Sequence, residues 1–212
     1  MTEFKAKCKL NNKGSAIVTV LIVIIFISIM ATTVLYLAGR NVKMKATDRH
    51  TKESFYETEK SMEEIKAGLI RIASESYEEA YAEVLKSYAE YDATARKNIF
   101  VTTFMDACEA KLAVDVDSKI DVAKFVTDAH ASVNKALYDG SKKVNGVIKL
   151  TGVTVTDTMN DYTTVIRTDF AIVAPTDIEF NVGFDTSVPD SPEDVKTFNA
   201  SDCVIYVNWE KR

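Results

Sequence analysis

The chain is poor in residues that interrupt regular structure. Its 212 residues include only three prolines and seven glycines, and no proline precedes Pro175. Between Ser15 and Asn98 only Gly39 and Gly68 weaken a helix, because glycine costs about 1 kcal/mol relative to alanine in a helix interior. A long helix without a break is therefore expected over the first half of the chain.

Residues that carry catalytic chemistry are also scarce. The two histidines, His50 and His130, do not stand in a metal-ligand spacing such as His-Glu-x-x-His. No Gly-x-Ser-x-Gly elbow, phosphate loop or Cys-x-x-Cys pair occurs. Asp115, Asp117 and Asp121 form an acidic cluster that could bind calcium, but it lacks the glycine and the final glutamate of an EF-hand, so a solvated turn with a helix cap is favoured. The sequence thus predicts a protein that is not an enzyme and has no cofactor or metal.

The cysteine content and the net charge of the chain limit which bonds and which binding partners are expected. Of the three cysteines, Cys8 lies near the N-terminus, and Cys108 and Cys203 lie in the second half of the chain. These two could form a disulfide in an oxidising compartment, or be two small buried thiols. The net charge is −5 at pH 7, so a nucleic-acid partner is disfavoured. Asn199-Ala200-Ser201 fits a glycosylation sequon, a match short enough to arise often by chance.

Charged residues are absent from the 25-residue run between Ser15 and Gly39. A helix of this length is about 37 Å long, against about 30 Å for the hydrocarbon core of a bilayer. Many of its residues are β-branched, but a lone segment in lipid must satisfy its own backbone hydrogen bonds, which favours the helix. Four lysines precede the run (Lys5, Lys7, Lys9 and Lys13), so the positive-inside rule places the leader in the cytoplasm and the chain after Arg40 outside.

Helical periodicity continues beyond this span. Apolar residues recur at spacings of three, four and seven, at Phe55, Met62, Ile65, Leu69 and Ile72. A tyrosine stripe follows between residues 74 and 97, formed by Tyr77, Tyr81, Val84, Tyr88 and Tyr91. The stripe is either a docking face for a helix or ligand, or the side by which this helix packs on its own core, and the second interpretation is favoured.

A third helical region is expected over residues 99–137. Its first half carries Phe100, Phe104, Cys108 and Leu112 on one face, and its second half carries Val122, Phe125, Ala129, Val133 and Leu137. Ser118 and Asp121 resemble a capping start for the second half, and Gly140 offers a left-handed stop.

Beyond Gly140 the period changes to two, which indicates strands. Strands are predicted over 147–156, 162–173, 178–184 and 203–209, with a turn at Asn145-Gly146. The fold class is therefore α+β, with helices first and a mainly antiparallel sheet last. The expected organisation is a leader over 1–14, a transmembrane helix over 15–39, an extended amphipathic helix over 40–98 and an exterior α+β head over 99–212.

Two segments carry a resemblance to a known family. The basic leader ending in Gly14, the small residue Ser15, the apolar helix that starts there, and the stretch Ser54-Phe55-Tyr56-Glu57-Thr58-Glu59-Lys60-Ser61-Met62-Glu63-Glu64 resemble the N-terminal region of type IV pilins. Within that family the chain most resembles minor pilins of the PilX-like kind. The C-terminal half is similar to a pilin head in layout only. The resemblance covers a quarter to a third of the chain.

The resemblance implies a processing site. A prepilin peptidase, an integral membrane aspartyl protease, would cut between Gly14 and Ser15 on the cytoplasmic side, and the new amine of Ser15 would be N-methylated. The expected partners are this peptidase, other pilin subunits through the N-terminal helix, and a membrane assembly platform. The expected location is the cytoplasmic membrane, as a single-pass protein with its C-terminal domain outside, and then a cell-surface filament.

One position departs from the family pattern. Pilins usually carry a glutamate five residues into the mature chain, where it is thought to neutralise the amine of a neighbouring subunit, and here that place is Thr19. The departure favours a minor subunit at the tip or start of a filament, although a tolerated variant in an ordinary subunit stays open. Two other functions also stay open: a pseudopilin of a secretion or DNA-uptake system, and an uncleaved membrane anchor with an extracytoplasmic binding module.

Overall fold

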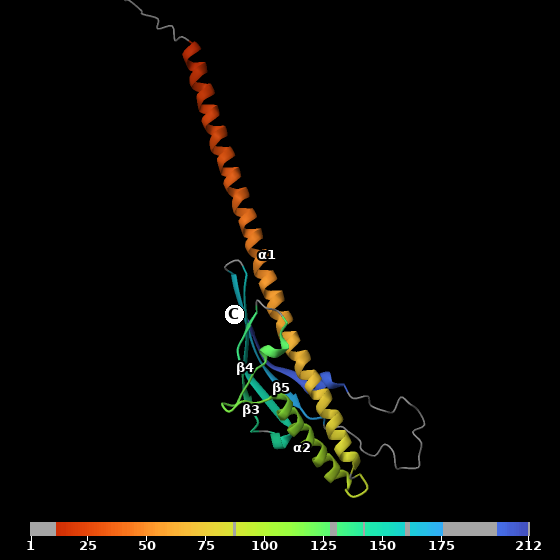
Figure 1. Ribbon diagram of the computed structural model, residues 1–212. Coiled ribbons are helices and arrows are strands. Elements are labelled where there is room, and N and C mark those ends of the chain that lie inside the picture. Colours follow the sequence, from red (N-terminus) through yellow and green to blue (C-terminus); the bar gives the residue numbers. More distant parts are fainter. Residues whose placement is uncertain are drawn as a thin grey trace, which may run out of the picture. The chain divides into compact units, whose positions relative to one another are not determined.

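The computed structural model describes residues 12–86, 88–127, 131–141, 143–159, 162–175 and 199–211. The chain forms two compact units, the first ending at Arg49 and the second beginning at His50. A long N-terminal helix and a second helix come first, and the strands after them form an antiparallel sheet (Figure 1). The α+β layout expected from the sequence is confirmed.

Helix α1 runs from Asn12 to Lys86 and has 75 residues. No proline interrupts it, and the cation of Lys86 in its last turn suits the negative end of the helix dipole. The structure ends this helix before the expected boundary at residue 98, because a turn follows over residues 88–91. Tyr88 and Tyr91, expected to extend the tyrosine stripe along the helix, lie in this turn instead.

Helix α2 runs from Ala93 to Leu112 and covers the first half of the expected third helical region. Asp92 caps it, because its Oδ1 atom accepts a hydrogen bond from the Ala95 N–H at 2.7 Å. The helix ends where Ala113 adopts a left-handed conformation, with φ of 54°. Its apolar face is buried at Phe100, Phe104, Cys108 and Leu112, as the periodicity predicted, and Met105 is buried with them.

The second half of that region is not a helix, so this prediction was wrong. Short elements replace it: β1 (Lys119–Ile120), η1 (Ala123–Phe125), β2 (Ser132–Val133) and β3 (Ala136–Asp139). Asp121 caps no helix here: its Oδ1 atom accepts from the Ala123 N–H at 3.1 Å, and the N-cap residue of the single turn η1 is Val122, which makes no side-chain capping bond. Pairing with the long strand that follows outweighs the local helical spacing, since β2 and β3 both bond to it. Gly140 follows β3 and stops no helix.

The sheet is built around one long hairpin. Strands β4 (Val147–Met159) and β5 (Tyr162–Val173) pair antiparallel, and β6 (Val204–Lys211) pairs with β5. The order is β1-β3-β4-β5-β6, with β2 also bonded to β4. These three strands confirm the predictions for 147–156, 162–173 and 203–209, whereas the predicted strand over 178–184 lies outside the described residues. The turn predicted at Asn145-Gly146 is present after η2 (Lys143–Asn145), with Gly146 at φ of 74°.

Two bulges meet at Asp169 on β5. One extra residue lies in β4 between Leu150 and Val153, and a second register shift on β6 falls beside Asp169. The carboxylate holds both irregularities, because Oδ1 accepts from the Gly152 N–H at 2.7 Å and Oδ2 accepts from the Asn208 amide at 2.8 Å. Gly152 has φ of 70°, a conformation that glycine adopts without strain.

The core of the second unit lies between the helices and one face of the sheet (Figure 1). From α1 it takes the predicted stripe, of which Met62, Ile65 and Leu69 are fully buried. From the sheet it takes Ile148, Leu150, Ile166 and Phe170, all fully buried. Each such side chain contributes about 1.5–3 kcal/mol when it leaves water, so the contact of α1 with the hairpin adds substantially to the stability of this unit.

Candidate functional site

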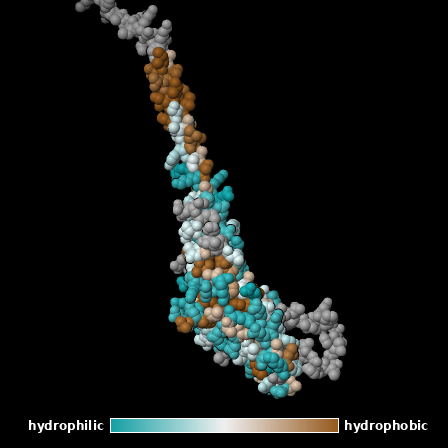
Figure 2. Space-filling model, in the orientation of Figure 1, coloured by the Kyte–Doolittle hydropathy of each residue, from teal (hydrophilic) through white to brown (hydrophobic). Residues whose placement is uncertain are grey.

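The apolar segment of α1 is the most distinctive surface of the first unit. Its large apolar side chains between Ile17 and Leu37 are all exposed, with exposed fractions from 49 % at Val23 to 71 % at Leu35. Figure 2 shows these hydrophobic side chains gathered along this stretch of the helix. Among the described residues this is the one helix long and apolar enough to cross a membrane.

Three hydroxyl groups within this segment, those of Ser28, Thr32 and Thr33, are satisfied inside the helix. Ser28 donates to the carbonyl of Ile24 at 2.8 Å, and Thr33 donates to the carbonyl of Ile29 at 2.7 Å. Thr32 bonds to carbonyls one turn earlier in the same way. A polar group without a partner is costly in hydrocarbon, so these bonds fit the segment to an apolar surrounding.

The C-terminal end of the segment has the chemistry of a membrane boundary. Arg40 is the first charged residue after the run, and its guanidinium carbon lies 5.8 Å from the centroid of the Tyr36 ring. Tyrosine and arginine are favoured where a helix leaves the hydrocarbon core for the headgroup region. This pair coincides with the end of the span predicted at Gly39.

The predicted processing residues lie at the start of the same helix. Because α1 begins at Asn12, the backbone of Gly14 and Ser15 belongs to its first turn. The first turn of a helix frays more readily than its interior, so this is the part of the helix where a protease gains the backbone most easily. Thr19, which stands at the usual glutamate position, lies one turn further along on the exposed surface.

The two cysteines expected outside the membrane are both buried free thiols, Cys108 on α2 and Cys203 in η4 (Ala200–Cys203). Burial raises the pKa of each thiol to about 11. The Cys203 thiol raises the pKa of Cys108 slightly further. Whether the two thiols pair in an oxidising compartment stays a prediction.

The acidic cluster of the second unit organises a turn. Asp115 Oδ1 accepts from the N–H groups of Asp117 and Lys119 at 3.1 and 2.7 Å, and its Oδ2 pairs with Lys135 at 3.0 Å. These bonds and the Lys135 ammonium keep the pKa of Asp115 below its ordinary value. The described residues contain no group of three or more histidine, cysteine or acidic side chains that could hold a metal ion.

The other residues named in the sequence analysis are a histidine, two tyrosines of the stripe and the asparagine of the sequon, and each contacts neighbouring side chains or backbone. The His50 ring stacks on Tyr162 with 6.2 Å between centroids and lies 3.3 Å from Glu53, and His130 lies outside the described residues. Tyr77 packs edge-on against Phe100 at 5.5 Å, which makes it part of the core, whereas Tyr81 is 38 % exposed. Asn199 of the sequon caps η4, where its side chain accepts from the Ser201 N–H.

Comparison of the chain with protein-family models, with curated proteins and with solved structures found no match. The surfaces described above must therefore be interpreted from their own chemistry. Sequence patterns did not point to Asp169, to the packing of Phe125 on α1, or to a hollow in which Phe125 takes part, because each depends on residues brought together from distant segments.

Proposed function

We propose that this chain is a structural minor pilin, a tip or initiation subunit of a type IV pilus-like filament, processed by prepilin peptidase. The observation that carries the proposal is the uncharged run from Ser15 to Gly39, which directly follows Lys13-Gly14 and whose side chains are exposed from Ala16 onward. Supporting it, the later part of the same helix packs beneath an antiparallel sheet, a layout similar to that of pilin heads.

The physics of assembly follows from the exposed segment. A helix that is stable in lipid leaves the bilayer only for another apolar surrounding, and a bundle of related helices provides one. Assembly would exchange lipid contacts for contacts with other pilin subunits along residues 15–39. The internally bonded hydroxyls of Ser28 and Thr33 make this exchange easier, because no polar partner in the membrane has to be given up.

Thr19 favours a place at the tip or start of the filament. In a filament shaft, a carboxylate on the helix of one subunit would neutralise the N-terminal amine of the next. An ionised carboxylate is tolerated in lipid when it is paired in this way. A threonine hydroxyl carries no charge for that role. The subunit would then be present in few copies per filament, at a position where it does not have to neutralise the N-terminal amine of a neighbour.

Mass spectrometry of the N-terminal peptide of the protein purified from membranes of its own host tests the proposal. We expect a chain that starts at a methylated Ser15. A chain that keeps Met1 and residues 2–14 would contradict it, and would support an uncleaved anchor with an extracytoplasmic binding module. Replacing Gly14 with alanine provides a matched control, because loss of processing in that variant ties the cut to this bond.

Fractionation then separates a pilus component from a pseudopilin. Quantitative mass spectrometry of sheared surface material should find the processed chain there, at a low ratio to a major subunit, if it belongs to a pilus tip. Retention of the processed chain in the membrane fraction would favour a pseudopilin of a secretion or DNA-uptake system.

A further inference from the structure

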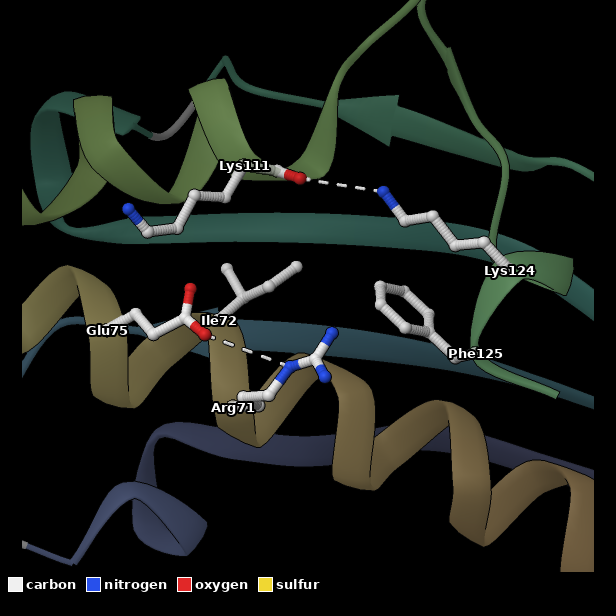
Figure 3. Close-up of a pocket in the computed structure, with 6 residues that line it drawn as sticks. All are labelled: Arg71, Ile72, Glu75, Lys111, Lys124 and Phe125. Atoms are coloured by element: carbon white, nitrogen blue, oxygen red, sulfur yellow. Dashed lines mark hydrogen bonds and ion pairs between the residues drawn. The ribbon is translucent and has the colours of Figure 1, made fainter. Parts of the chain in front are cut away.

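A hollow of about 350 Å³ opens on the second unit between α1, the end of α2 and η1. Its lining consists of Arg71, Ile72, Glu75, Lys111, Lys124 and Phe125. Figure 3 shows Ile72 and Phe125 at the centre of this hollow and the charged side chains around them. Ile72 is 5 % exposed, so the hollow has an apolar floor and a polar rim.

The three cations on the rim are not equally neutralised. Lys111 makes a close ion pair with Glu79. Lys124 instead donates to backbone carbonyls at the end of α2, at 3.5 Å to Lys111 and 3.2 Å to Leu112. Carbonyl groups hold the ammonium in place without cancelling its charge. The ammonium also lies 5.0 Å from the centroid of the Phe125 ring, so its positive charge stands beside the apolar floor of the hollow.

Arg71 is the second cation on the rim whose charge is only weakly neutralised. Its Nε atom lies 3.8 Å from Glu75 Oε1, too far for a hydrogen bond, and both side chains are largely exposed. Exposed pairs of this kind are worth little. Arg71 and Lys124 thus place two positive charges against the one carboxylate of Glu75, on a chain whose net charge is negative.

We propose that this hollow binds a small organic acid that carries a ring. Its carboxylate would lie between Arg71 and Lys124, for which the planar guanidinium is well suited, and its ring would cover Ile72 and Phe125. An apolar floor with a few convergent polar groups is the usual composition of small-molecule sites. This site is independent of the filament proposal, since it uses only residues of the second unit.

Titration of the full chain in detergent micelles, followed through the Ile72 δ1-methyl signal in NMR, tests the site. The probe is benzoate, and the matched control ligand is benzamide, which has the same ring without the charge. We expect benzoate to shift the Ile72 signal to saturation and benzamide to leave it in place. Partition of either probe into the micelle would move isoleucine methyl signals of residues 17–29 and not that of Ile72. Glucuronate, tested alongside, distinguishes a sugar acid from an aromatic acid as the natural source of the carboxylate.

Two substitutions with opposite expected effects keep the test independent of folding. Arg71→Gln should weaken benzoate binding by about threefold, the size expected for one exposed charge contact. Glu75→Gln should tighten binding by a similar factor, because it removes the carboxylate that competes for Arg71. Glu83→Gln and Lys86→Gln, an ion-paired couple further along α1, should change nothing. Equal responses to benzoate and benzamide, or unchanged affinity in both hollow variants, would overturn the proposal.

Discussion

The ring of Phe125 lies directly against the backbone of Gly68. A Cβ atom added at Gly68 would lie 2.3 Å from Phe125 Cδ1 and 2.5 Å from Cγ, closer than real Cβ contacts. The missing side chain of one residue therefore makes room for the ring of the other, although the two are far apart in the sequence. Through this contact η1 is fixed on α1 next to the hollow.

Gly68→Ala should destabilise the second unit, against the trend of helix propensity. Alanine in place of glycine favours a helix by about 1 kcal/mol, whereas overpacking costs about 1–3 kcal/mol, and a ring held against a helix backbone has little room to yield. Urea unfolding of the full chain in detergent, followed by tryptophan fluorescence, would measure the change. In a Phe125→Ala background the same substitution should become stabilising. A gain in stability from Gly68→Ala alone would contradict the packing described.

Asp169→Ala should lower the free energy of unfolding by about 0.5–1.5 kcal/mol, the usual net contribution of a hydrogen bond, because its bond with Gly152 is partly buried and its bond with Asn208 is exposed. The substitution removes the acceptor for the Gly152 N–H and for the Asn208 amide. Chemical unfolding of this variant beside Glu78→Ala, an exposed helix position, would check it. The role of Asp169 would be disproved by two variants of equal stability.

Acid should weaken the link between α2 and the loop before β4. Lys143 pairs with Asp106 at 2.5 Å and with Glu109, and its hydrogen bond to Glu109 lowers the pKa of that carboxyl below the ordinary 4.5. A lowered folded-state pKa contributes stability above the ordinary value and loses it as the pH falls through the folded pKa. Unfolding between pH 7 and pH 3 should therefore show a smaller loss of stability for Glu109→Gln than for the unsubstituted chain. Identical pH profiles would argue against this link.

Cys108 and Cys203 should resist alkylation in the folded chain. Because burial raises the pKa of both thiols to about 11, almost no thiolate, the reactive form, is present at pH 8. Mass spectrometry after iodoacetamide treatment should show slow labelling in the folded protein and rapid labelling in urea. If protein from its own host takes up label only after reduction, the two thiols form a disulfide there.

Helices and strands could be predicted from the sequence where a single local pattern dominates. The charge-free run and the absence of proline indicated α1, and the strict alternation from Tyr162 to Val173 indicated β5. Residues 118–137 could not be assigned in this way, because their apolar residues fit a helical spacing, whereas the short strands β2 and β3 in and beside this region pair with β4. In short segments, pairing with a distant strand decides between helix and strand, and the sequence does not show which strand that is.

The candidate sites likewise differ in how far the sequence alone could predict them. The segment from Gly14 to Thr19 could be singled out because its signal is local and continuous. The hollow could not, since Arg71, Lys111 and Lys124 come from three elements and are ordinary surface residues in each of them. Likewise, Asp169 has the pattern of an outward-facing strand residue, and only the register of β4 and β6 reveals what it holds.

The register shift in β6 makes the edge of the sheet irregular. Val207 is the extra residue between Tyr206 and Asn208, and among the described strands β6 has a neighbour on one side only. A kinked strand presents an uneven row of backbone donors and acceptors, which discourages a second chain from adding to it. Copies of the chain that come close together are therefore not expected to join edge to edge at β6 into a continuous intermolecular sheet.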